Sequence, residues 1–304
     1  MPELPEVETI RRGLRRTIVG KKIARVEVRL SKMIAFGPDT VSNIRKTSQA
    51  RALEFVEILK GQRIIDIRRR AKVLMICLSR GYTLLVHLKM TGQLIFAKAG
   101  ERKSIKAFNT EQSPRFTLPG KHTHVIVGFA GGSMLYFNDL RQFGYLRLVA
   151  NHDMDRVKEL SAFGPEPFAK DFNFDYFTGQ MRRRPNLSIK QFITIPAVVA
   201  GVGNIYSDEI LYCAKVRPER KAGSLKPAEK KELFKCVPRI LKEGVVYHGS
   251  SVGDYFKVDG SEGTYGKRHR VYGRKGLPCR KCGTMITSVK LGGRTSSYCP
   301  KCQR

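Results

Sequence analysis

The sequence lacks any run of 18 consecutive apolar residues, and it is short of acidic side chains. No segment is therefore expected to cross a membrane as a helix, and the first residues hold no apolar region typical of a secretion signal. We expect a cytoplasmic protein. Only 26 Asp and Glu stand against 57 Lys and Arg among 304 residues, a formal net charge of +31. So large a basic excess predicts a polyanionic partner.

The basic charge is concentrated in two blocks. Residues 1–150 carry a net charge of +17, residues 151–214 of −1 and residues 215–304 of +15. A uniformly charged surface would not leave the middle of the chain neutral. We therefore expect two binding faces held by a scaffold, with DNA or RNA between them. The length predicts two domains.

The first 150 residues have the pattern of one helix followed by short strands. Leu4, Val7, Ile10 and Leu14 lie on one side of an expected helix over 4–16. Alternating or apolar runs between turn signals predict strands at 24–30, 63–69, 73–78, 82–88, 124–129, 134–137 and 145–149. The pattern is typical of a β-sandwich. The polar residues 98–120 indicate a long loop.

After a domain boundary near 150, the sequence favours helices. They are expected at 155–161, 173–183, 188–193, from about 204, and from Ser224 to about His248. Pro238 lies inside the last of these and is expected to kink or break it.

Four of the seven cysteines have the spacing of a metal site: Cys279-x2-Cys282-x16-Cys299-x2-Cys302. Two such knuckles, separated by the length of a β-hairpin, bring four thiolates onto one tetrahedral zinc ion. Disulfides are the competing interpretation, which an expected cytoplasmic location disfavours. With four cysteine ligands the site is closed, so the zinc is expected to fold the hairpin and to do no chemistry.

The other cysteines and the histidines do not form a second metal pattern. Three cysteines lie in apolar contexts and are expected in the core: Cys77, Cys213 and Cys236. Three histidines are expected to be structural or to face DNA: His87, His122 and His124. Of these, His122 is our candidate DNA contact.

Pro2 has two interpretations. A proline in the first turn, followed by Glu3 and Glu6, is a common start of a helix. Alternatively, removal of Met1 would leave Pro2 with a free secondary amine, whose pKa of about 8 makes it a usable nucleophile near neutral pH. Glu3 would then be the neighbouring acid or base.

Taken in order, six motifs resemble one family, the formamidopyrimidine-DNA glycosylase and endonuclease VIII family of base-excision repair enzymes. The motifs are Met1-Pro-Glu-Leu-Pro-Glu-Val-Glu8, Arg69-Arg-Ala-Lys72, His87-Leu-Lys-Met-Thr-Gly92, Asp139-Leu-Arg-Gln-Phe-Gly144, Gly201-Val-Gly-Asn-Ile-Tyr206 and the four cysteines. The resemblance covers essentially the whole chain. It implies an α+β protein with three parts: a helix and β-sandwich domain (1–150), a helical domain with a helix–two-turns–helix motif (151–276), and a zinc-finger β-hairpin (277–304).

The resemblance also assigns catalytic roles. Pro2 would be the nucleophile and Glu3 the acid and base, with a pKa that repulsion from Glu6 and Glu8 could raise. Glu6 would position the helix or bind the lesion. Two residues would place positive charge on the reacting sugar and its phosphates: Lys72 and Arg294.

Further residues would hold the DNA. Met90, Arg141 and Phe143 would fill the gap left by the extruded nucleotide. Asn204 would cradle a phosphate at a helix start, or act only as an N-cap. Lys190 would be another phosphate contact.

The resemblance implies a monomeric, bifunctional DNA glycosylase and abasic-site lyase that needs one structural Zn²⁺. Its expected substrates are oxidised purines (8-oxoguanine and formamidopyrimidines) in double-stranded DNA, removed through a proline Schiff base and β,δ-elimination in the bacterial cytoplasm, at the nucleoid. The alternatives are an endonuclease VIII-like enzyme for oxidised pyrimidines and a zinc-ribbon DNA-binding protein without catalysis.

The chain departs from the family pattern at three places. Ile193-Thr-Ile-Pro196 replaces the usual residues before the Val-Ala-Gly run, and 98–120 is longer than is typical. Gly253 and Lys257 lie in the segment that in the family covers the damaged base. These departures concern the choice of lesion rather than the chemistry.

Overall fold

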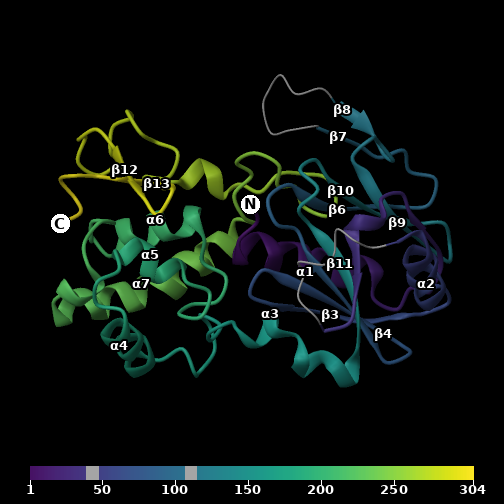
Figure 1. The fold of residues 1–304 in the computed structure, drawn as a ribbon. Coiled ribbons are helices and arrows are strands. Elements are labelled where there is room, and N and C mark those ends of the chain that lie inside the picture. Colours follow the sequence, from purple (N-terminus) through teal and green to yellow (C-terminus); the bar gives the residue numbers. More distant parts are fainter. Residues whose placement is uncertain (39–47, 107–114) are drawn as a thin grey trace. The chain divides into compact units, whose positions relative to one another are not determined.

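The computed structural model describes residues 1–38, 48–106 and 115–304, which form two compact units (Figure 1). The first unit consists of Met1–Ser161 and His248–Thr264, and the second of Ala162–Tyr247 and Tyr265–Arg304. The segment His248–Thr264 follows the helical part in sequence. It nevertheless belongs to the first unit, because Tyr255 and Val258 are buried in that unit's apolar core.

The first unit begins with helix α1 (Leu4–Ile18), which packs against the sandwich strands. The expected apolar side of this helix is confirmed, since Leu4, Val7, Ile10 and Leu14 are at most 1% exposed. The opposite side carries exposed arginines. The helix is therefore fixed along its whole length by burial.

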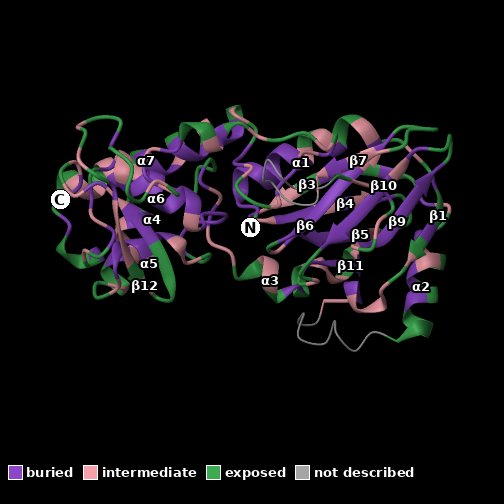
Figure 2. Ribbon diagram, turned by 90° about the horizontal axis from the view of Figure 1, so that it is seen from above, coloured by how far each residue is buried: buried purple, intermediate pink, exposed green. Residues whose placement is uncertain are grey.

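Two sheets form the sandwich. The first has the order β1-β9-β10-β6, with β1 (Ile23–Val28), β9 (Thr123–Phe129), β10 (Met134–Asp139) and β6 (Gly92–Ala97). The second has the order β2-β11-β5-β4-β3, with β2 (Ile34–Phe36), β11 (Tyr145–Ala150), β5 (Tyr82–His87), β4 (Val73–Leu78) and β3 (Ile64–Arg70). Residues of both sheets share one core, and Figure 2 colours the central strands as largely buried. The expected helix plus β-sandwich is confirmed.

Several elements of this unit differ from expectation. Strands β2 and β6 and helix α2 (Gln49–Leu59) were not predicted. Helix α2 buries only Ala52, Phe55 and Leu59, so its periodicity is weak. The stretch 98–120 is not wholly a loop, because β7 (Ser104–Lys106) pairs with β8 (Arg115–Thr117); residues 107–114 lie outside the described residues. A short helix, α3 (Lys158–Ser161), closes the unit's first segment.

Four helices and one hairpin make up the second unit. The helices are α4 (Phe174–Arg183), α5 (Ile189–Thr194), α6 (Asn204–Cys213) and α7 (Pro227–Val246), and the hairpin consists of β12 (Thr287–Leu291) and β13 (Arg294–Tyr298). The helix expected from Ser224 begins at Pro227, where the Glu229 carboxylate accepts a hydrogen bond from the Lys226 N–H. Pro238 does not break α7, because buried Leu233, Val237 and Leu241 hold both sides of the proline in the core.

Two of the cysteines expected as separate core residues are bonded to each other. Cys213 at the end of α6 and Cys236 in α7 form a disulfide, with their Cα atoms 6.0 Å apart. The expectation was wrong for Cys213, which is also partly exposed. Sequence spacing does not indicate this pairing, because the packing of α6 on α7 brings the two residues together.

Within the described residues, no helix is both long enough and apolar enough to cross a lipid bilayer.

The packing of α7 on α6 makes Gly244 the most sensitive glycine of this contact. A Cβ atom at Gly244 would lie 2.4 Å from Cε1 of Tyr206, which is fully buried and stacked on Tyr265. We expect Gly244→Ala to lower the free energy of unfolding by about 1–3 kcal/mol because the core is overpacked. In the control Gly179→Ala, on α4, the nearest atom to the new Cβ is 3.8 Å away. That change should leave stability equal or up to about 1 kcal/mol higher, as measured by urea denaturation.

Candidate active site

The start of α1 is buried and held by a carboxylate. Glu6 accepts hydrogen bonds on both oxygens, from the Glu3 N–H at 2.8 Å and from the Ser250 N–H at 2.7 Å. Pro2 and Glu3 are themselves buried at this helix start. Of the two roles expected for Glu6, these contacts favour positioning the N-terminus, because both oxygens already bind backbone groups.

Glu8, one turn further along α1, is surrounded by arginines. Its carboxylate accepts hydrogen bonds from Arg11 at 2.8 and 2.9 Å, from Arg12 at 2.8 Å and from Arg69 at 3.2 Å. Burial alone would raise the pKa of Glu8, but the hydrogen bonds and charges of these arginines outweigh it and hold the pKa at about 2. Because its charge is compensated by these arginines, Glu8 is a poor source of the repulsion that we expected to act on Glu3.

The Glu8 contacts reach the turn that carries Lys72. Arg69, on β3, donates to Glu8 and also to the carbonyl of Ala71 at 2.9 Å. Ala71 is buried and has a φ of 52°, which an L-residue adopts only when its surroundings fix it. Arg69 thus ties the Lys72 turn to α1, so that the structure brings Lys72 and the N-terminus into one connected group.

The three side chains expected to enter DNA lie on two connected loops. Met90 and Phe143 are 39% and 41% exposed, and the guanidinium of Arg141 lies 4.9 Å from the centre of the Phe143 ring. The buried Asp139 joins the loops, because its carboxylate accepts from the Thr91 hydroxyl and from the N–H groups of Arg141 and Gly144. The hydrogen bonds of Asp139 therefore fix the backbone of the two loops from which Met90, Arg141 and Phe143 project.

The histidines behave differently from one another. His124 is buried, with Nε2 2.8 Å from the Asp139 carbonyl, and buried His87 accepts from the Lys89 N–H through Nδ1. Both are structural. His122 is partly exposed, and its pKa is lowered by burial and then by the charge of Lys121. It is therefore neutral at pH 7 and suited to hydrogen bonding rather than ion pairing.

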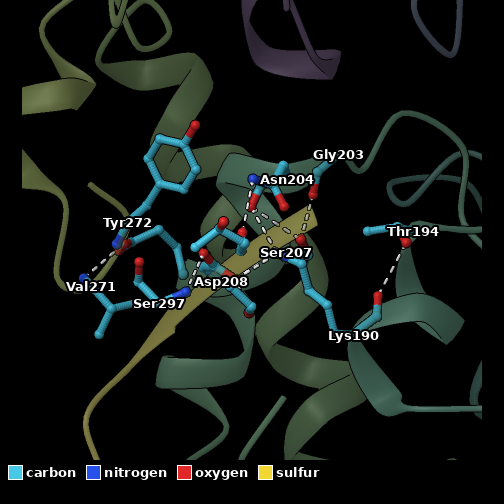
Figure 3. A network of polar contacts seen from close by, with 12 residues as sticks. Lys190, Thr194, Gly203, Asn204, Ser207, Asp208, Val271, Tyr272 and Ser297 are labelled. Atoms are coloured by element: carbon cyan, nitrogen blue, oxygen red, sulfur yellow. Dashed lines mark hydrogen bonds and ion pairs between the residues drawn. The ribbon is translucent and has the colours of Figure 1, made fainter. Parts of the chain in front are cut away.

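In the second unit, Asn204 is the first residue of α6 (Figure 3). The N-cap is Gly203, so the alternative that Asn204 is a plain N-cap was wrong. The Asn204 amide donates to the Thr295 carbonyl of the hairpin at 3.2 Å. Its position at a helix start suits an anion, because the first N–H groups of a helix have no partner within the helix.

Lys190 faces inward. Its ammonium group is 3% exposed, and it donates to Asp208 at 2.5 Å and to the Asn204 carbonyl at 3.0 Å. A direct phosphate contact by Lys190 would require this ion pair to open, and it stays a prediction. As arranged, Lys190 supports the start of α6.

Two neighbouring buried carboxylates of α6 hold the chain before the four-cysteine segment and within it. Asp208 accepts hydrogen bonds from the Ser296 hydroxyl and from the Ser297 N–H of β13. Glu209 accepts from three successive N–H groups, those of residues 270–272, each at 3.0 Å. Figure 3 shows both sets of contacts converging on α6. Arg294 is exposed at the β12–β13 turn, where it follows two glycines of positive φ.

The four cysteines form a metal site. Their Sγ atoms all lie within 4.8 Å of one another, and two pairs are separated by 3.5 and 4.0 Å. Four sulfurs around a tetrahedral zinc at about 2.3 Å stand about 3.8 Å apart, so the cluster fits one Zn²⁺. The hydroxyl of Tyr212 on α6 lies 3.4 Å from the Cys279 sulfur, to which it can donate.

Comparison with known proteins identifies the family. Residues 1–146 match the formamidopyrimidine-DNA glycosylase N-terminal domain, residues 163–255 the formamidopyrimidine-DNA glycosylase H2TH domain, and residues 276–304 the zinc finger found in FPG and IleRS. The chain belongs to the formamidopyrimidine-DNA glycosylase family. The chain is thus a DNA glycosylase, and the zinc expected from the cysteine spacing is confirmed as one structural ion.

Individual relatives agree over the full length. The formamidopyrimidine-DNA glycosylase of Pelotomaculum thermopropionicum is 40% identical and covers 100% of this chain and 99% of its own. The structure of Lactococcus lactis Fpg with DNA that contains an abasic site aligns with a TM-score of 0.82 at 31% identity, covering 99% of both chains. The same protein with DNA that contains an oxidised pyrimidine aligns with a TM-score of 0.81 at 31% identity, covering 100% of both.

In this formamidopyrimidine-DNA glycosylase family member, sequence reasoning missed the buried carboxylates that hold the candidate residues within each unit. Asp139, Asp208 and Glu209 all bind backbone N–H groups in the interior. A signal was present for two of them, since Asp208 and Glu209 are adjacent acids among the apolar residues of α6. A buried carboxylate needs several hydrogen-bond donors, so these two acids could have been predicted to bind backbone N–H groups.

The arginine cluster around Glu8 predicts a pH-dependent stability. The pKa of Glu8 falls from 4.5 to about 2 on folding, so its contribution is complete above pH 4.5 and is lost as the pH falls from about 4.5 to 2. Glu8→Gln should lower the free energy of unfolding at pH 7 by up to about 3 kcal/mol and flatten its decline between pH 5 and 2. Glu27→Gln, in an exposed ion pair with Arg29, should change it by about 0–1 kcal/mol. Chemical denaturation at several pH values measures both variants. If Glu8→Gln and Glu27→Gln lowered the free energy of unfolding equally, the stabilising role of the arginines around Glu8 would be contradicted.

Removal of zinc should unfold the hairpin selectively. With the four thiolates uncompensated, we expect a chelator to release one Zn²⁺ per chain and to abolish amide hydrogen-exchange protection in β12 and β13. The β-sandwich strands should keep theirs. Protection of the hairpin that survives complete loss of the metal would show that the zinc is not needed for its fold.

Proposed function

We propose that this chain is a bifunctional DNA glycosylase and abasic-site lyase that removes oxidised purines from duplex DNA. The observation that carries the proposal is the buried start of α1, where Glu6 binds the N–H of Glu3 and of Ser250 and so fixes Pro2 and Glu3. The resemblance to Lactococcus lactis Fpg, solved with DNA that contains an abasic site, supports it. The net charge of +31 suits a DNA substrate.

The chemistry begins once Met1 has been removed. The uncharged amine of Pro2 attacks C1′ of the damaged nucleotide, and the bond between C1′ and the base breaks with its electron pair leaving on the base, which takes up a proton. Glu3 protonates the sugar ring oxygen as the ring opens, giving a positively charged iminium. The iminium acidifies the neighbouring C2′ proton, so that β-elimination and then δ-elimination expel the two phosphates and cut the strand.

Polar and positively charged residues would stabilise the DNA phosphates and the phosphate oxygens that leave during elimination. Lys72 is held by Arg69 in a turn that is tied to α1, and we assign it to the reacting sugar and its phosphate. We assign Asn204 and Arg294 to the backbone phosphates, Asn204 through the start of α6. Lys190 would act by supporting Asn204, whose carbonyl it binds.

The exposed loop side chains would replace the extruded nucleotide in the stack. Met90 and Phe143 provide the apolar surface, and Arg141 would hydrogen-bond the base left without a partner. Asp139, which holds both loops, is the residue that would keep the three side chains in register.

Oxidised pyrimidines are the second candidate substrates, because Lactococcus lactis Fpg was also solved with DNA that contains an oxidised pyrimidine. Oxidised purines remain our first choice, because the Leu4-Pro5 start and the Arg141-to-Gly144 loop resemble the formamidopyrimidine branch of the family. With chromosomal DNA as the substrate, we place the enzyme as a monomer in the bacterial cytoplasm, at the nucleoid.

Borohydride trapping tests the proposal. An iminium between Pro2 and the sugar is reduced by sodium borohydride to a stable amine, so a duplex that contains 8-oxoguanine should become covalently attached to the protein. Pro2→Gly exchanges the secondary amine for a primary amine, which still forms a reducible imine, so it should slow trapping about tenfold without abolishing it, while its affinity for an abasic-site analogue should stay within about threefold. A thymine glycol duplex run in parallel should trap more slowly than 8-oxoguanine.

An uncleavable N-terminal extension provides the matched control. It converts the Pro2 nitrogen into an amide while leaving every side chain in place, so it should bind DNA and trap nothing. Full trapping by the extended protein would mean that another amine is the nucleophile. Absence of trapping by the processed wild-type protein, despite DNA binding, would favour the non-catalytic alternative.

A further inference from the structure

The segment His248–Thr264 touches the N-terminus at one end. Ser250 donates to Glu6, and Gly249 is so close that a Cβ atom there would lie 2.9 Å from Cγ of Glu6. The other oxygen of Glu6 accepts from Glu3. The Glu6 carboxylate therefore links this end of the segment to Glu3, the residue to which we assign acid and base catalysis.

The other end of the segment is anchored to the sandwich. Phe256 and Val258 are buried, the Phe96 N–H donates to the Val258 carbonyl at 2.8 Å, and the Gln93 amide donates to the Asp254 carbonyl at 2.9 Å. Between these anchors, Val252 and Gly253 are exposed, Val252 by 48%. This tip is the part of the segment that can reach a nucleotide.

Strands β7 and β8, which we call the arm, cover the anchored end. Ile105 of β7 is 1% exposed and shares an apolar cluster with Phe256. A Cβ atom at Gly260 would lie 3.0 Å from Cγ2 of Ile105. Lys106 forms an ion pair with Glu262 at 3.7 Å. The arm thus contacts the segment by packing and by charge.

The arm lies between the segment and the sandwich, because the same apolar cluster also contains Ile95 of β6 and Ile126 of β9. Its two strands pair with each other in a sheet that is separate from both sheets of the sandwich. Phe116 of β8 lines one small cavity together with Asp254, next to the exposed tip. An element that adds no strand to the sandwich and packs on the segment at several points is suited to holding that segment in one conformation.

We propose that the arm braces the segment so that its exposed tip is held in place over the damaged base. The inference rests on the proposed function. A braced tip loses less conformational entropy when a base arrives, so base release should depend on the brace. An abasic site has no base for the tip to contact, so strand cleavage at a preformed abasic site should not depend on it.

Two rates measured on the full-length protein separate these steps. They are the single-turnover release of 8-oxoguanine from a duplex and the cleavage of a duplex that already contains an abasic site. Ile105→Ser weakens the apolar cluster that joins the arm to Phe256 of the segment. We expect it to slow base release about tenfold or more and to leave abasic cleavage within about twofold.

A charge exchange tests the same brace without touching the core. Lys106→Glu should slow base release about threefold through repulsion from Glu262, and Lys106→Glu combined with Glu262→Lys should restore it. Lys60→Glu is the matched control, because Lys60 is exposed at the end of α2 and the change reverses the same charge. Glu262→Lys should not rescue that variant.

The outcomes are distinguishable. The brace is overturned if Ile105→Ser slows both rates equally or leaves both unchanged. It is also overturned if the charge exchange fails to restore base release. If Ile105→Ser does not fold, the charge exchange decides alone. A wild-type protein that performs neither reaction overturns the proposed function itself.

Discussion

The candidate site depends on one buried carboxylate, that of Glu6. A buried carboxylate is stable only when its oxygens are hydrogen-bonded, and Glu6 achieves this by binding the N–H of Glu3 and of Ser250. The same bonds therefore fix the N-terminus and attach to it a segment 244 residues away. If the carboxylate were lost, both would be free to move, and the nucleophile would lose its defined position.

The second unit is also held together by buried carboxylates that accept hydrogen bonds from backbone N–H groups. Asp208 and Glu209 sit side by side on α6, and each is buried because backbone N–H groups satisfy it, one set from β13 and one from residues 270–272. The helix start at Asn204 and the hairpin, whose turn carries Arg294, are thereby held by the same helix, and the zinc site joins the two ends of the hairpin. Rigid support of this kind suits a site that must hold phosphates in register.

Local patterns were predictable from the sequence, and distant pairings were not. The apolar side of α1 and the cysteine spacing repeat over a few residues, so periodicity and spacing found them. Strand β6 was not predicted, because it begins at Gly92, the last residue of the His87-to-Gly92 motif, and its residues do not alternate between apolar and polar. The disulfide between Cys213 and Cys236 was missed because it depends on the packing of α6 against α7. The partner of a charged side chain was also not predictable. We expected Lys190 to bind a DNA phosphate, but in the structure it forms an ion pair with Asp208.

The central claim is that Pro2, fixed at the start of α1, is the nucleophile. The most direct measurement is mass spectrometry of the borohydride-reduced complex after digestion of the DNA and the protein. The account predicts that the sugar remnant is attached to the peptide that begins with Pro2, at its α-nitrogen and without Met1. A remnant on Lys72 or on any other lysine, with an unmodified Pro2 peptide, would contradict it.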